Sequence, residues 1–106
     1  MAVIKASDAD FAAALSSKPL SIVKYYADWC GSCKLIAPKF RRLSEDERFT
    51  GVQFLEVNAE ENPDARHRAG VNNLPFFATG LTSNRALTPQ PPPNRTLRQK
   101  LLNPPR

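Results

Sequence analysis

Cys30 and Cys33 are the only cysteines in the chain, and their type and spacing make them the residues best suited to chemistry. A thiolate attacks a disulfide bond, whereas a protonated thiol does not. At this spacing a second thiol can reach the first across one helical turn and release the mixed disulfide that the first one forms. The pair therefore predicts thiol–disulfide exchange, with Cys30 as the attacking thiol and Cys33 as the resolving thiol.

Two elements must hold the cysteines in place, a strand before them and a helix after them. Residues 20–26 are rich in β-branched and aromatic side chains, which predicts a buried strand. Residues 34–48 carry apolar side chains at helical spacing, which predicts a helix: Leu35, Ile36, Phe40 and Leu43. Pro38 falls inside that helix and is expected to bend it. The unpaired N–H groups and positive dipole end of a helix start favour a thiolate, above all at Cys30.

The segment from Trp29 to Lys34 resembles the active site of the thioredoxin family, Trp-Cys-Gly-Pro-Cys-Lys, with Ser32 where proline is usual. The resemblance continues through residues 36–38, 57–63 and 70–75, and it runs from about residue 2 to residue 79. It implies an α/β, thioredoxin-like fold, in which helices flank a central mixed β-sheet. The alternation of predicted strands and helices along the chain is consistent with that fold.

Composition and charge divide the chain near residue 79. Residues 1–79 hold ten basic and ten acidic residues, whereas residues 80–106 hold five basic residues, no acid and six of the ten prolines. Such a composition favours disorder or polyproline II. We therefore expect a thioredoxin-like domain over residues 1–79. Over residues 80–106 we expect a flexible, Pro-rich basic tail, in place of the family's final strand and helix. A shifted reading frame near codon 80 is our hypothesis for its origin.

The resemblance also implies contacts with a substrate. The family has a cis proline facing its cysteines at the position of Pro75, and the backbone before it pairs with the substrate. By position, that role falls to Leu74 and Pro75. Trp29 is expected to be a partly exposed ring that flanks the site and contacts the substrate. Gly31 and Ser32, between the cysteines, are expected to tune the stability of their thiolates.

Lys24 and Glu56 differ from the family pattern. The position of Lys24 is typically a buried aspartate behind the second cysteine, and the position of Glu56 is often a neighbouring lysine. This chain holds the two charges exchanged. Either both side chains point to solvent at the strand ends, or they form a partly buried ion pair. In the second case, Glu56 would relay the proton of the resolving thiol.

The resemblance implies a protein-disulfide reductase without metal or organic cofactor. We expect protein disulfides as substrates, a disulfide reductase as electron donor, a monomer and a cytoplasmic location. Nucleic acid is not an expected partner because the basic tail lacks interleaved aromatic residues, and no apolar run is long enough to span a membrane. Two alternatives remain open: a truncated or frameshifted chain with weak activity, and a non-enzymatic interaction module.

Overall fold

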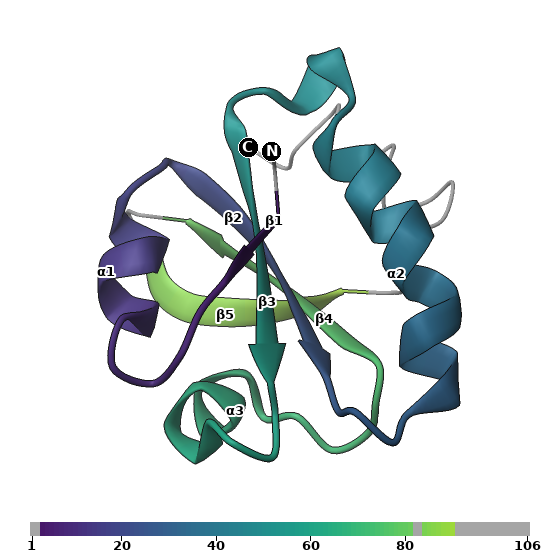
Figure 1. Cartoon of the computed structure of the whole chain (residues 1–106). Coiled ribbons are helices and arrows are strands. Elements are labelled where there is room, and N and C mark those ends of the chain that lie inside the picture. The colour runs from purple at the N-terminus through teal and green to yellow at the C-terminus, as the bar shows by residue number, and fades with distance from the viewer. Residues whose placement is uncertain (1–2, 82–83, 91–106) are drawn as a thin grey trace.

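The computed structural model describes residues 3–81 and 84–90, and its central feature is a five-stranded sheet in the order β1-β3-β2-β4-β5. The strands are β1 (Val3–Lys5), β2 (Leu20–Tyr26), β3 (Val52–Asn58), β4 (Phe76–Leu81) and β5 (Asn84–Gln90). The central strand β2 pairs parallel with β3 and antiparallel with β4, so the sheet is mixed (Figure 1). The predicted mixed sheet and the predicted strand over residues 20–26 are confirmed.

Within the described residues, four helical segments accompany the sheet: α1 (Phe11–Ser16), α2 (Gly31–Ser44), a short 3-10 turn (Glu47–Phe49) and α3 (Pro63–Ala69). Helix α2 continues through Pro38. It begins three residues before the predicted start at Lys34, because Cys30 itself caps it. Helix α3 ends at Gly70, whose positive φ of 65° suits glycine. In the described part of the chain, no helix is both long and apolar enough to cross a membrane.

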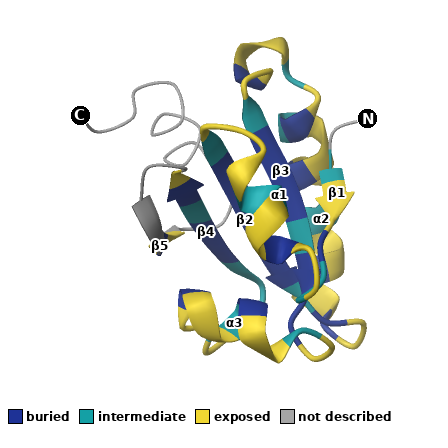
Figure 2. Ribbon diagram, turned by 90° about the vertical axis from the view of Figure 1, so that its left-hand side faces the viewer, coloured by how far each residue is buried: buried dark blue, intermediate teal, exposed yellow. Residues whose placement is uncertain are grey.

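The two faces of the sheet bury different apolar clusters, because successive side chains of a strand point to opposite faces. On one face, Phe40 of α2 packs with Ile22 and Phe77. On the other, Phe11 of α1 and residues of α3 pack with Val23 and neighbouring strand residues. Figure 2 shows the buried residues, in dark blue, along β2, β3 and β4. The sheet is therefore covered on both sides. The cysteine pair follows the end of its central strand, β2.

The structure differs from the sequence expectation just beyond residue 79. Strand β4 continues to Leu81, and residues 84–90 form strand β5, which pairs antiparallel with β4. The composition predicted a flexible tail there, but pairing with β4 outweighs the weak strand propensity of this Pro-containing stretch. Pro89 is tolerated because β5 is an edge strand of the described sheet. The remainder of the tail prediction, for residues 82–83 and 91–106, lies outside the described residues.

Leu87 gives a test of whether β5 belongs to the folded domain. Its side chain is 8% exposed, and it joins the cluster of Val23, Tyr25 and Ala78. We expect Leu87→Ala to lower the free energy of unfolding by about 2 kcal/mol, the low end for a buried leucine because β5 lies at an edge. Urea denaturation measures this loss. The exposed neighbour Thr88 supplies the control, Thr88→Ala, and equal stabilities of the two variants would contradict docking of β5.

Candidate active site

Cys30 and Cys33 form a disulfide at the start of α2, with their Cα atoms 5.3 Å apart. Cys30 is the N-cap of the helix, and its Sγ accepts a hydrogen bond of 3.1 Å from the backbone N–H of Cys33. The Lys34 N–H donates to the Cys30 carbonyl oxygen. The helix start thus presents an N–H donor to Cys30 Sγ, which in the reduced protein would stabilise a thiolate there.

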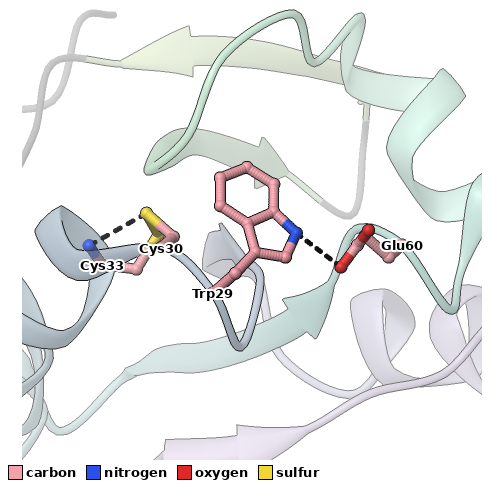
Figure 3. Close-up of a disulfide and its surroundings, with 4 residues drawn as sticks. All are labelled: Trp29, Cys30, Cys33 and Glu60. Carbon is pink, nitrogen blue, oxygen red and sulfur yellow. Dashed lines mark hydrogen bonds between the residues drawn. A yellow bond between two sulfur atoms is a disulfide. The ribbon is translucent and has the colours of Figure 1, made fainter.

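Trp29 lies between the disulfide and Glu60 (Figure 3). Its side chain is 69% exposed, and its Nε1 donates a 2.7 Å hydrogen bond to Glu60 Oε1. Asn58, at the end of β3, positions Glu60 by accepting from its backbone N–H at 3.0 Å. The exposure of Trp29 was predicted, but its contact with Glu60 was not. No pattern of neighbouring residues signals this contact, because Trp29 and Glu60 each follow the end of a strand and meet only through the parallel pairing of β2 and β3.

The Leu74–Pro75 peptide bond is cis, as the family resemblance implied. Leu74 packs against the buried cluster of Ala27, Cys30 and Cys33. The segment before β4 therefore lies against the disulfide, although more than forty residues separate the two in the sequence. Gly31 and Ser32 are exposed, and a Cβ added to Gly31 would meet no other group within 4 Å.

Lys24 and Glu56 form an ion pair, so the reading in which both point to solvent is wrong. The Lys24 Nζ lies 3.4 Å from Glu56 Oε2, and the two side chains are 5% and 21% exposed. The parallel register of β2 and β3 places the two residues directly opposite each other. Burial lowers the pKa of Lys24, while the Glu56 carboxylate opposes that shift. The Lys24 ammonium also lies 5.3 Å from the Phe40 ring centre and 5.6 Å from that of Tyr26.

A cavity of about 220 Å³ joins this ion pair to the disulfide. Cys33, Lys24 and Glu56 all line it, together with Tyr26 and Ala37 among others. Tyr26 also packs against the cysteine cluster. The pKa of its hydroxyl is raised, mainly by burial and to a smaller extent by the negative charge of Glu56. The cavity is large enough to admit water between Cys33 and Glu56.

Leu35 does not take the place that its periodicity predicted. It was one of four apolar residues on the expected inner face of α2, but its side chain is 80% exposed. Phe40 is fully buried, and Ile36 and Leu43 pack against the same cluster. The earlier start of α2 does not explain the exposure of Leu35. Which side chains of α2 point to the core is decided by how the helix packs on the sheet. Leu35 and Trp29 are both exposed apolar side chains within five residues of the cysteines.

Comparisons with known proteins agree with this arrangement. The thioredoxin family model matches residues 2–94, and thus includes β5. A thioredoxin of Staphylococcus aureus is 33% identical over 98 residues, which cover 89% of this chain and 91% of that protein. Thioredoxin Asp f 29 of Aspergillus fumigatus is 38% identical over 74 residues, 67% of each chain. Thioredoxin-T of Drosophila melanogaster is 41% identical over 70 residues, which span 66% of this chain but 44% of that protein.

Solved structures show the same fold. The thioredoxin of Plasmodium falciparum superposes with a TM-score of 0.76 at 24% identity, over 96% of both chains. The thioredoxin of Malassezia sympodialis superposes with a TM-score of 0.77 at 21% identity, over 95% of this chain and 91% of that one. The family match and the bonded cysteine pair together support thiol–disulfide oxidoreductase chemistry. The chain belongs to the thioredoxin family.

Proposed function

We propose that the protein reduces disulfide bonds of other proteins by dithiol exchange through Cys30 and Cys33. The observation that carries this proposal is the disulfide at the start of α2, with a backbone N–H donated to Cys30 Sγ. A thiolate at Cys30 gains the same hydrogen bond and the helix dipole, which lower the cost of its negative charge. Cys33 lies inside the first turn of α2 and does not cap the helix, so we assign it the role of resolving the mixed disulfide.

The reaction proceeds in two exchanges. The Cys30 thiolate attacks one sulfur of the substrate disulfide, a mixed disulfide forms, and the other substrate sulfur leaves with the bonding electrons and takes up a proton. The Cys33 thiolate then attacks Cys30 Sγ, the Cys30–Cys33 bond forms, and the second substrate sulfur leaves and is protonated. The protein dithiol is oxidised to a disulfide, and the substrate disulfide is reduced to two thiols.

Glu56 is the proton acceptor for Cys33 in this proposal. Its carboxylate lines the same cavity as Cys33, whereas the other ion-pair partner, Lys24, is a cation. Glu56 retains 21% exposure, so it can exchange its proton with solvent after each turnover. Because the two charges of the pair are exchanged relative to the family pattern, the carboxylate that can accept the Cys33 proton is at position 56 instead of position 24.

Substrate binding is assigned to Trp29, Leu74 and Pro75. Trp29 offers an exposed ring next to the disulfide, and exposed aromatic residues commonly dominate protein–protein contacts. Leu74 packs against the cysteine cluster, so the backbone of residues 74–75 lies where an extended substrate segment would reach Cys30. Gly31 and Ser32 are assigned the tuning of the thiolates from their positions between the cysteines. We propose that the protein acts as a monomer.

A dithiol that reduces other proteins must itself be reduced after each turnover. We therefore propose a disulfide reductase as the electron donor, with the protein contributing to electron transport and cell redox homeostasis. The compartment that fits such a cycle is the cytoplasm, where thiols are kept reduced.

Reduction of insulin disulfides tests the function. With dithiothreitol as the reductant, we expect the protein to accelerate the precipitation of the freed insulin B chain well above the rate with dithiothreitol alone. The control is the Cys30→Ser/Cys33→Ser double variant, which lacks both thiols and whose folding is checked by circular dichroism. A folded wild-type protein that does not exceed this control would contradict the proposal and would leave a non-enzymatic interaction module as the function.

A further inference from the structure

Lys24 is a buried cation beside the cysteine pair, and the reaction proposed above gives it no task. Its side chain is 5% exposed, and its ammonium is held between the Glu56 carboxylate and the rings of Phe40 and Tyr26. Such a position is costly for a charge unless an anion remains close to it. The question is what happens to that anion when Glu56 accepts a proton.

Cys33 and both residues of the ion pair line the same cavity. Cys33 is 3% exposed. Among the charged residues that line this cavity, Lys24 is the buried one. Lys5, Asp28 and Lys34 also line it, but all three are exposed, so solvent screens their charges. Arg41 and Glu45 line a second cavity that the ion pair also lines, and both are exposed too. Lys24 is therefore the buried charge available to a Cys33 thiolate.

We propose that the Lys24 ammonium stabilises the Cys33 thiolate while Cys33 resolves the mixed disulfide. When the Cys33 proton moves to Glu56, the carboxylate becomes neutral and the negative charge moves to the Cys33 sulfur. The ammonium thus exchanges one anionic partner for another and never stands alone. When the Cys30–Cys33 bond forms, the departing substrate sulfur takes up a proton, and Glu56 returns to its ionised form by releasing one. The inference rests on the proposed function, since it assigns Lys24 a part in the resolving step.

The test measures the thiol itself and requires no turnover. In a Cys30→Ser background, Cys33 is the only thiol, and the pH dependence of its alkylation rate gives its pKa. We expect Lys24→Met to raise the pKa of Cys33 by about one unit, because a nearby opposite charge favours the ionised form. We expect Glu56→Gln to lower it, because Lys24 then has no other anion nearby. Lys24→Arg keeps the cation and should keep the pKa near its starting value.

The pKa of Cys33 is expected to rise in Lys24→Met and to fall in Glu56→Gln, and these opposite changes distinguish an electrostatic role of Lys24 from a structural one. Loss of packing or of local order would move the pKa of Cys33 in the same direction in both variants, or in neither. The matched control is Lys39→Met, an exposed lysine of α2 that lines neither cavity. An unchanged pKa in Lys24→Met, or a raised pKa in Glu56→Gln, would overturn the proposal. If Lys24→Met does not fold, Lys24→Gln, which removes the charge but keeps a polar head group, takes its place.

A kinetic consequence follows with Cys30 present. At a pH below the pKa of Cys33, a rise of one unit leaves about tenfold less thiolate, but each thiolate is more nucleophilic, so release of a trapped substrate thiol should slow only about three- to fourfold. Single-turnover release from a mixed disulfide with a fluorescent peptide measures this rate. Failure of the insulin assay would refute the proposed function, whereas unchanged Cys33 chemistry in the Lys24 variants would refute this inference alone.

Discussion

Replacing Cys33 with serine is expected to trap a covalent mixed disulfide between Cys30 and a substrate, and to reduce insulin turnover to the rate with dithiothreitol alone. The expectation follows from the N-cap position of Cys30, whose sulfur accepts the Cys33 N–H. Without a resolving thiol, the first exchange proceeds and the second cannot. Non-reducing electrophoresis followed by mass spectrometry of the linked peptide identifies the trapped cysteine.

Cys30→Ser is the matched variant for this experiment. It retains a thiol of almost equal burial, since Cys30 and Cys33 are 5% and 3% exposed. We expect it to trap no substrate, because Cys33 lies within the first turn of α2 and Cys30 alone caps the helix. Trapping through Cys33 in Cys30→Ser, with none through Cys30 in Cys33→Ser, would reverse the assignment of attacking and resolving thiols.

Loss of one partner of the Lys24–Glu56 pair is expected to lower the free energy of unfolding more than an exchange of the two charges does. Glu56→Gln leaves the Lys24 side chain, which is 5% exposed, without its anion, and we expect a loss of about 3 kcal/mol in the free energy of unfolding. That value is the low end for buried pairs, because Glu56 keeps 21% exposure. Release of substrate by Cys33 should also slow, although the Cys33 thiolate is then more stable, because the buried thiol has lost the group that accepts its proton. Urea denaturation and single-turnover release measure the two effects.

The exchange of the two charges provides the control for this prediction. Lys24→Asp alone sets two carboxylates opposite each other in the β2–β3 register, and Glu56→Lys alone sets two ammonium groups there. We expect the double variant Lys24→Asp/Glu56→Lys to recover most of the stability and of the rate that each single change removes. Additive losses in this cycle would show that the two residues do not interact.

Local sequence patterns determined much of this structure. The β-branched and aromatic run at residues 20–26, and the helix that follows the cysteines, could be located because each depends on side chains close together in the chain. The cysteine pair and the cis bond before Pro75 were identified from motifs that resemble the family. The outward position of Leu35 was not predictable in this way, because periodicity does not say which way a helix lies on a sheet.

The tertiary structure alone decided the features that depend on pairing between distant residues. Lys24 and Glu56 could have pointed to solvent, and only the register of β2 against β3 brings them together under the cysteines. Glu60 reaches Trp29 because the same two strands end side by side. Residues 84–90 have the composition of a tail, but the hydrogen-bonding edge of β4 makes them a strand and buries Leu87. In each case the stabilising partner lies on another strand or just after its end, and a pattern of neighbouring residues carries no information about it.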